Sequence, residues 1–309
     1  MNMNRREFIA AVLAGTAGLA VNCAFRSAGS GRGHSDDPYQ LVPLGKTGLK
    51  PTLIGFGTGM RGGNRQSNQT RLGRETFEAL LKTAHEKGVR YFDCADLYGT
   101  HPYVGRVLKS VPRDSIVIGT KIWDRPGGIP EPERPTADAV VDRFRKELDT
   151  DFLDLVLLHC MTDARWPEAE KRQMDTLEDL KAKGVIRAHG VSVHSLDALK
   201  ACMDSPWVDS VHVRINAFGD SMDNKDPAVV ADILARLHAA GKGVIGMKLV
   251  GEGRYRNDPE KRDRSIQYVL GLQSVDAMIV GFEKAEEIDD FAARVKKALH
   301  LRTMQKKAA

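Results

Sequence analysis

Two kinds of hydrophobic pattern alternate along most of the chain. Short apolar runs rich in Val and Ile predict buried strands. Each run is followed by a segment with apolar residues at i, i+3, i+4 and i+7, which is typical of an amphipathic helix. One such segment has its apolar residues at Phe77, Leu80, Leu81 and Ala84. It is followed by Gly88, which stands where a left-handed C-terminal cap is expected. The pattern therefore predicts strands that alternate with helices.

Eight strands are predicted in this way, at residues 53–57, 89–93, 116–121, 153–158, 186–191, 209–215, 243–247 and 276–280. Parallel strands need the helical crossovers that follow each of them. Eight such units in about 250 residues, without a glycine-rich GxGxxG loop after the first strand, favour a closed barrel over a doubly wound sheet. Residues 39–52 predict a hairpin that turns at Lys46, Thr47 and Gly48. The expected fold class is α/β, a (β/α)8 TIM barrel preceded by a short N-terminal β-hairpin.

The N-terminal segment does not share this pattern. Arg5 and Arg6 precede Phe8 and a run of 13 uncharged residues, Ile9 to Val21. The run has the length of a signal-peptide core but is shorter than the ~20 residues that span a bilayer. This arrangement resembles a twin-arginine (Tat) export signal. The alternative is an uncleaved amphipathic start.

These features divide the chain into a Tat signal peptide of undetermined cleavage site (1–28), a flexible linker (29–38), the barrel (39–300) and a basic C-terminal tail (301–309). The resemblance implies an exported, periplasmic or extracytoplasmic protein with the Tat machinery as a partner. Cys23 fits a lipid anchor poorly, because Asn22 stands where a lipobox has a small residue. The mature domain is not expected to span a membrane.

Composition limits the possible functions. A chain of 309 residues with 42% hydrophobic content can bury one large core. Residues 1–28 contribute three arginines and one glutamate to the formal net charge of +5. The basic and acidic residues in the remainder of the chain are too evenly balanced for a nucleic-acid-binding surface. The four cysteines form no CxxC pair, and we expect no structural metal.

Ionisable residues end three successive predicted strands. Asp93 ends the second strand, Lys121 the third and His159 the fourth, and Tyr98 follows Asp93 by five residues. Because the C-terminal ends of barrel strands meet on one face, these four side chains are expected to converge there. A buried Lys–Asp pair or a strand-end histidine alone is commonly structural. Four such residues together favour an active site.

Several segments resemble successive signatures of the aldo-keto reductase superfamily over residues 39 to 300. They are "GKTGLKPTLIGFGTG", "FDCADLYG", "IGTKIW", "LVLLHCM" and "RAHGVSVHS". The resemblance implies a barrel that binds NAD(P)H across its strand ends and reduces aldehydes or ketones. It also implies a catalytic tetrad at Asp93, Tyr98, Lys121 and His159.

The chemistry accounts for these residue types. Hydride transfer to a carbonyl leaves negative charge on oxygen, which needs a proton donor and polar stabilisation. We expect Lys121 to lower the pKa of the Tyr98 phenol from its usual value of about 10, and Asp93 to keep Lys121 charged. His159 is expected to donate to the carbonyl oxygen. Trp123 is expected to line the substrate pocket or only to pack, and Asp96 is interpreted as a turn or cap residue.

The resemblance also implies a set of cofactor-binding positions, although several depart from the family pattern. Ser192 takes the serine that binds the carboxamide, but Val193 replaces the following asparagine. Arg214 and Asn216 are the substitutes for a missing glutamine, and Met247 replaces a stacking tyrosine. Lys248 either approaches the pyrophosphate or is a surface lysine. The other expected positions are Gly57, Thr58, Val250, Gly251, Gly281, Lys284, Glu287 and Asp290.

The segment after the eighth strand bears on cofactor choice. NADP-preferring members hold the 2′-phosphate with Lys and Arg, and a comparison without gaps puts Gly281 and Glu287 at those positions. Because carboxylates repel a phosphate, we expect a preference for NAD(H). NADP(H) remains possible if Lys284 reaches the phosphate. The alternative is that this acidic segment has no role in cofactor binding and is only the solvent-exposed start of a helix, where carboxylates interact favourably with the helix dipole.

The sequence thus predicts an NAD(P)-dependent oxidoreductase with Tyr98 as general acid/base. One alternative is a redox-inert nicotinamide-binding regulatory or interaction protein on the same barrel. The other is a barrel hydrolase or aldolase with Lys121 as nucleophile, which the neighbouring Asp93 disfavours. The polar loops after the strands suggest a small carbonyl or sugar substrate.

Overall fold

The computed structural model describes residues 36–130 and 134–308. The expected Tat signal, Cys23 and residues 29–35 of the expected linker lie outside the described residues. Residues 131–133 of the loop after the third strand are also outside them.

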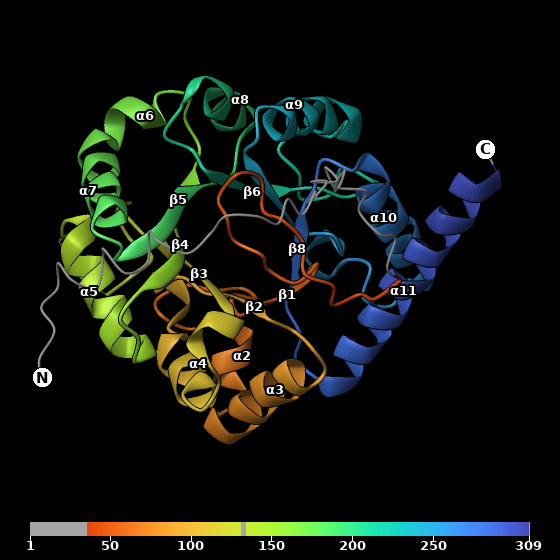
Figure 1. Ribbon diagram of the computed structural model, residues 1–309, viewed down its shortest axis with the longest axis horizontal. Helices are drawn as coiled ribbons and strands as arrows, with labels where there is room; N and C mark the ends of the chain where they lie inside the picture. The colour runs from red at the N-terminus through yellow and green to blue at the C-terminus, as the bar shows by residue number, and fades with distance from the viewer. Residues whose placement is uncertain (1–35, 131–133, 309) are drawn as a thin grey trace, which may run out of the picture. The chain divides into compact units, whose positions relative to one another are not determined.

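The strands form one closed parallel barrel in chain order, and β8 pairs with β1. Figure 1 shows the strands at the centre of a ring of helices. The strands are β1 Ile54–Gly57, β2 Tyr91–Asp93, β3 Val117–Ile122, β4 Leu153–Met161, β5 Ile186–Val193, β6 Ser210–Arg214, β7 Gly243–Met247 and β8 Ala277–Val280. The eight expected strands and the closed barrel are confirmed.

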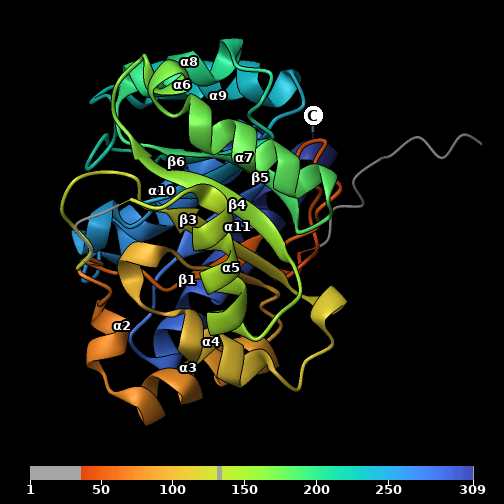
Figure 2. The same cartoon turned by 90° about the vertical axis from the view of Figure 1, so that its left-hand side faces the viewer.

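Helices cover the outside of the barrel because each buries one apolar stripe against the strands. In α3 the buried residues are Phe77, Leu80, Leu81 and Ala84, the positions with helical spacing in the sequence. Figure 2 shows α5 and α7 side by side on the outer face of β4 and β5. The α-helices are α2 Asn68–Arg71, α3 Arg74–Glu86, α4 His101–Leu108, α5 Ala137–Leu148, α6 Trp166–Ala169, α7 Lys171–Ala182, α8 Leu196–Asp204, α9 Pro227–Ala239, α10 Pro259–Leu272 and α11 Ala285–Ala308. The short 3₁₀ turns are η1 Asp96–Tyr98, η2 Arg113–Ser115 and η3 Gly251–Gly253.

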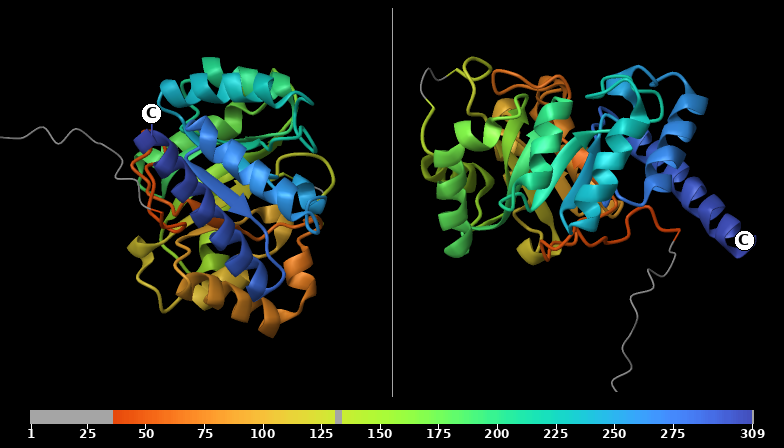
Figure 3. Two further views of the ribbon diagram at one scale, coloured as in Figure 1. Left: turned by 90° about the vertical axis from the view of Figure 1, so that its right-hand side faces the viewer. Right: turned by 90° about the horizontal axis from the view of Figure 1, so that it is seen from above.

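The N-terminal hairpin closes one end of the barrel. Leu41 and Thr52 form an antiparallel bridge. Gly45 N donates to Asp276 Oδ2 at 3.2 Å, and Lys46 N donates to Gly241 O at 2.8 Å, at the starts of β8 and β7. Figure 3 (right) shows this red segment at the end opposite the loops that follow the strands. The C-terminal strand ends are therefore the face available for chemistry.

Apolar side chains fill the barrel interior, as this fold requires. They include Leu44, Leu49, Val117, Leu155, Leu157, Ala188, Ile245 and Ala277. Residues 301–308, which we expected to form a basic tail, continue helix α11. Among the described residues, no helix is long and apolar enough to cross a membrane, and no cluster of His, Cys, Asp and Glu could hold a metal ion.

Candidate active site

Asp93 and Lys121 form a buried ion pair at the ends of β2 and β3. The Lys121 Nζ donates to both Asp93 carboxylate oxygens at 2.7 Å and to Cys94 O at 2.8 Å. Burial raises the pKa of Asp93, and the Lys121 ammonium opposes this shift. All three ammonium protons are thus directed to oxygen atoms of the turn that leads to Tyr98.

The Tyr98 phenol is held by glycines and faces His159. Tyr98 ends the 3₁₀ turn η1, which is terminated by Gly99 at φ 64°. Its ring packs so closely on the β1–α2 loop that a Cβ at Gly59 or Gly62 would lie 2.2 or 2.4 Å from a ring carbon. Its hydroxyl lies 3.3 Å from His159 Nε2. The two groups therefore converge on one point where a carbonyl oxygen can bind.

The pKa of Tyr98 is raised well above 10, first by burial and then by the Asp93 carboxylate. The expectation that Lys121 lowers it is wrong for this structure. The Lys121 Nζ lies 5.3 Å from the Tyr98 ring centroid, and its protons and charge are directed to Asp93. Tyr98 consequently keeps its proton at neutral pH, as a proton donor must.

His159 is neutral and packed against Trp123. Burial, and then the Lys121 charge, hold the pKa of His159 well below 6.5. The Trp123 ring meets the His159 ring edge-on at 5.4 Å between centroids, and its Nε1 donates to Gly127 O at 2.5 Å. Trp123 thus packs edge-on against His159 and does not line the groove described below.

Asp96 has a larger role than the turn or cap residue that we expected. Its carboxylate is buried, and it pairs with Arg65 at 3.0 Å and with Arg143 at 2.7 Å. These contacts tie η1 to the β1–α2 loop and to α5. Because ion pairing between distant segments leaves no local pattern in the sequence, only the fold reveals this anchor.

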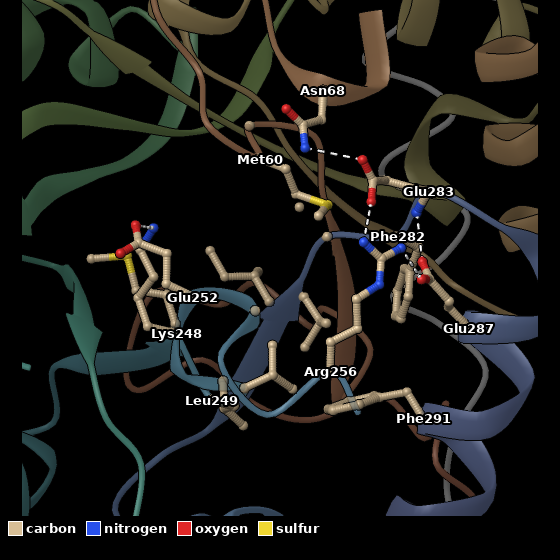
Figure 4. Close-up of a pocket in the computed structure, with 18 of the residues that line it drawn as sticks. Met60, Asn68, Lys248, Leu249, Glu252, Arg256, Phe282, Glu283, Glu287 and Phe291 are labelled. Carbon is tan, nitrogen blue, oxygen red and sulfur yellow. Dashed lines mark hydrogen bonds and ion pairs between the residues drawn. The ribbon is translucent and has the colours of Figure 1, made fainter. Parts of the chain in front are cut away.

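A groove of about 590 Å³ extends from Tyr98 to the start of α11. It is within the size range of cofactor sites. Several expected cofactor positions line it, namely Gly57, Met247, Lys248, Val250, Gly281, Glu287 and Asp290. Lys248 is held by Glu252 at 2.8 Å, and Figure 4 shows this pair at one side of the groove.

The remaining expected cofactor positions do not line this groove. Thr58 donates to Asp93 O at 2.9 Å, and Ser192 Oγ accepts from Cys160 N at 2.8 Å. Asn216 is buried and donates to Asp220 O at 2.7 Å. The other three are Arg214, which pairs with Asp223; Gly251, at φ 59° in η3; and Lys284, which is exposed.

The far end of the groove contains an ion-pair cluster that the sequence did not indicate. Arg256 binds Glu283 at 2.8 Å and Glu287 at 2.5 Å, and Asn68 donates to Glu283 at 3.0 Å (Figure 4). Arg256 comes from the loop after β7, whereas the comparison without gaps covered only the segment after β8. The arginine nearest these carboxylates was therefore missed.

Comparisons with known proteins agree with this geometry. A model described as "Aldo/keto reductase family" matches residues 53–266. The NADH-specific methylglyoxal reductase of Escherichia coli is 25% identical over 204 residues, covering 60% of this chain and 61% of that enzyme. "Probable aldo-keto reductase 1" of Glycine max is 30% identical over 222 residues, covering 69% and 60%. The matches thus span about three fifths of the length of these two relatives. An aldo-keto reductase from Bacillus halodurans in its holo form has a TM-score of 0.65 at 19% identity, over 85% of this chain and 95% of that one, which shows the shared fold.

Proposed function

The chain belongs to the aldo/keto reductase family, and from this premise we propose that it interconverts an aldehyde or ketone and its alcohol using a nicotinamide cofactor. One observation carries the proposal: Tyr98 and His159 converge at 3.3 Å beside the buried Lys121–Asp93 pair, at the head of the groove.

The groove residues fit an extended dinucleotide. The lining includes Gly253, where a Cβ would meet nothing within 4 Å, so a ligand can approach the backbone there. The Lys248 ammonium offers a charge for a pyrophosphate. When bound, the cofactor supplies or accepts the hydride.

The protein side chains handle the proton and the charge on oxygen. The Tyr98 phenol donates its proton as negative charge develops on the carbonyl oxygen. The neutral His159 orients that oxygen through Nε2. Lys121 is held by its hydrogen bonds to Asp93 and Cys94 O, with its Nζ 5.3 Å from the centroid of the Tyr98 ring. Because the raised pKa of Tyr98 favours the phenol, this arrangement suits carbonyl reduction at neutral pH.

The finer proposal is a preference for NADH over NADPH. The guanidinium of Arg256 forms ion pairs with Glu283 and Glu287. A 2′-phosphate bound in this part of the groove would have to compete with these two carboxylates for that guanidinium. NADPH binding would require Arg256 to leave them. The name of the Escherichia coli relative as NADH-specific agrees with this choice.

For substrate and location, the proposals are a small polar carbonyl compound or sugar, and export through the Tat machinery. Because free nicotinamide nucleotides are not expected outside the cytoplasm, the cofactor would be bound before export and reoxidised by a second substrate on the same enzyme.

The deciding experiment is incubation of purified protein with NADH or NADPH and a panel of aldehydes, ketones and sugars, followed by absorbance of the reduced nicotinamide. Carbonyl-dependent loss of absorbance supports the proposal. Cofactor binding without turnover on any carbonyl would favour the redox-inert alternative. Borohydride trapping of a carbonyl on Lys121 would favour the aldolase alternative.

A further inference from the structure

A buried histidine outside the groove joins a barrel strand to the helix layer. His101, the first residue of α4, is buried and does not line the groove. Its Nδ1 lies 2.7 Å from Glu147 Oε2 on α5, and its Nε2 lies 2.7 Å from Thr120 Oγ1 on β3. Both ring nitrogens therefore have a partner, and the two partners belong to different elements.

A close approach of α4 and α5 brings the histidine to its carboxylate. A Cβ at Gly105 on α4 would lie 2.8 Å from Leu148 O at the end of α5. No side chain fits there, so this glycine lets the two helices pack closely. Because residues four apart lie on one face of a helix, His101 faces α5 together with Gly105. The contact with Glu147, which precedes Leu148, follows from this packing.

The start of α4 is also fastened to the barrel through Thr100, the residue before His101. Thr58 Oγ1 donates to Asp93 O at 2.9 Å, so its contact of 2.7 Å with Thr100 Oγ1 must use the Thr100 proton. Both threonines are buried. His101 therefore extends from a helix start that is tied to the ends of β1 and β2.

The direction of each hydrogen bond of His101 follows from the donors available. A carboxylate only accepts, so His101 Nδ1–H donates to Glu147. In a neutral ring, Nε2 then accepts the hydroxyl proton of Thr120. The ring needs no charge to balance Glu147, because that carboxylate already pairs with Arg143 at 3.0 Å. This tautomer leaves neither nitrogen without a partner.

From Glu147 the contacts continue to the turn that carries Tyr98. Arg143, one turn earlier on α5, pairs with Glu147 at 3.0 Å and with Asp96 at 2.7 Å. Asp96 is the first residue of η1, and Tyr98 is its last. His101 is thus connected to η1 through two ion pairs of α5.

The other contact of His101 leads to the strand that carries Lys121. Thr120 precedes Lys121 on β3, and successive side chains of a strand point to opposite faces, so Thr120 faces the helices while Lys121 faces the barrel interior. Lys121 Nζ in turn donates to Cys94 O, just before η1, at 2.8 Å. The contacts therefore form a closed ring through β3, α4, α5 and η1.

We propose that His101 is a positioning residue that holds β3 and η1 at a fixed separation. Through Thr120 it fixes the strand that carries Lys121, and through Glu147 it fixes the turn that carries Tyr98. The catalytic consequence of this inference rests on the proposed function, whereas the placement of Tyr98 can be measured without a reaction.

Thr120→Val tests the contact with the strand, because it removes the hydroxyl next to His101 Nε2 and keeps the shape of the side chain. We expect kcat for carbonyl reduction to fall about tenfold, since a small displacement of Lys121 or Tyr98 misplaces the proton donor. The KM of the carbonyl and the dissociation constant of NADH should stay within about twofold of wild type. Thr120→Ser, which keeps the hydroxyl, should restore kcat to within about twofold.

Glu147→Leu tests the contact with α5 and should lower kcat in the same way, whereas Glu147→Gln, which keeps an acceptor oxygen, should largely restore it. In His101→Leu, the addition of Thr120→Val should change kcat by less than about twofold, because the partner of the hydroxyl is already absent. Glu178→Leu is the matched control. It removes a carboxylate of α7 that lies 3.0 Å from another buried histidine, His189 on β5, and should keep wild-type kcat.

Carbon-13 NMR of protein labelled at the tyrosine ring carbon that bears the hydroxyl measures the placement of Tyr98 without a reaction. The Tyr98 signal, identified from Tyr98→Phe, should shift in Thr120→Val and in Glu147→Leu but not in Thr120→Ser or Glu178→Leu. A merely structural role would lower only the folded fraction, measured by circular dichroism, and would leave the Tyr98 signal and kcat per folded molecule unchanged.

An unchanged Tyr98 signal in folded Thr120→Val, or in folded Glu147→Leu if the first variant does not fold, overturns the inference. If no carbonyl is reduced by the wild type, the proposed function fails, but the Tyr98 signal still decides the role of His101.

Discussion

At the scale of single residues, the proton is held by one group of the site, the Tyr98 phenol, and the positive charge lies on another, the Lys121 ammonium. Burial and the Asp93 carboxylate hold the proton on Tyr98, and the ammonium of Lys121 is directed to Asp93. His159 stays neutral because burial and Lys121 lower its pKa. The phenol of Tyr98 and the imidazole of His159 are thus both uncharged at neutral pH, which suits proton donation to a carbonyl oxygen.

Cofactor choice also belongs to this scale. In the double variant Glu283→Gln and Glu287→Gln, NADPH should bind about tenfold more tightly, because Arg256 is released from two carboxylates. NADH affinity should change by less than about threefold. Titration of cofactor-free protein, followed by nucleotide fluorescence, measures both affinities.

Lys284→Ala is the matched control for that titration. Lys284 is exposed and does not line the groove, so its removal should alter neither affinity. Tighter binding of NADPH than NADH by the wild type, lost in Lys284→Ala, would show that this lysine holds the phosphate and that the assignment to Arg256 is wrong.

At the scale of elements, the β1–α2 loop and the turn η1 act as one unit that positions the phenol. Gly59 and Gly62 lie against the Tyr98 ring. The Asp96 carboxylate fastens η1 to Arg65 of the same loop and to Arg143 of α5. The phenol is therefore placed by backbone contacts on one side and by buried ion pairs on the other.

Gly62→Ala should displace the Tyr98 ring, because the new Cβ would lie 2.4 Å from a ring carbon. We expect kcat to fall about 100-fold, with circular dichroism unchanged. Gly63→Ala adds the same methyl group one residue later, where nothing lies within 4 Å, and should have wild-type kcat. Equal activity of the two variants would contradict the proposed packing of Tyr98.

The elements show what could be predicted from the sequence. Strand positions and the residues at their ends follow from periodicity, so the barrel, Asp93, Lys121 and His159 were placed correctly on the strands. The far end of the groove could not be predicted, because Arg256 meets Glu283 only after β7 and β8 have paired. The pKa direction of Tyr98 was wrong because proximity to Lys121 was considered without burial, which raises this pKa most, and without the Asp93 charge, which raises it further.

At the scale of the whole molecule, the two ends of the barrel have different tasks. The hairpin packs on the starts of β7 and β8, while the opposite face holds the Asp93–Lys121 pair, Tyr98, His159 and the groove. Substitutions in the hairpin are thus expected to affect folding, and substitutions in the opposite loops to affect substrate choice.

The proposed export through the Tat machinery also belongs to this scale. Replacement of Arg5 and Arg6 by lysines should retain the protein in the cytoplasm, since a Tat signal depends on the arginine pair. Fractionation followed by immunodetection measures the distribution, with a lysine replacement at Arg26 as the control. Unchanged export of the double-lysine variant would contradict a Tat route.

Comparison of Tyr98→Phe with wild type, in carbonyl reduction and in NADH binding, tests the central claim most directly. Phenylalanine keeps the ring that packs on Gly59 and Gly62 but removes the donated proton. The account predicts that kcat for the best carbonyl in the panel falls at least about 100-fold, while the dissociation constant of NADH stays within about twofold. Unchanged turnover in Tyr98→Phe would contradict the assignment of Tyr98 as proton donor.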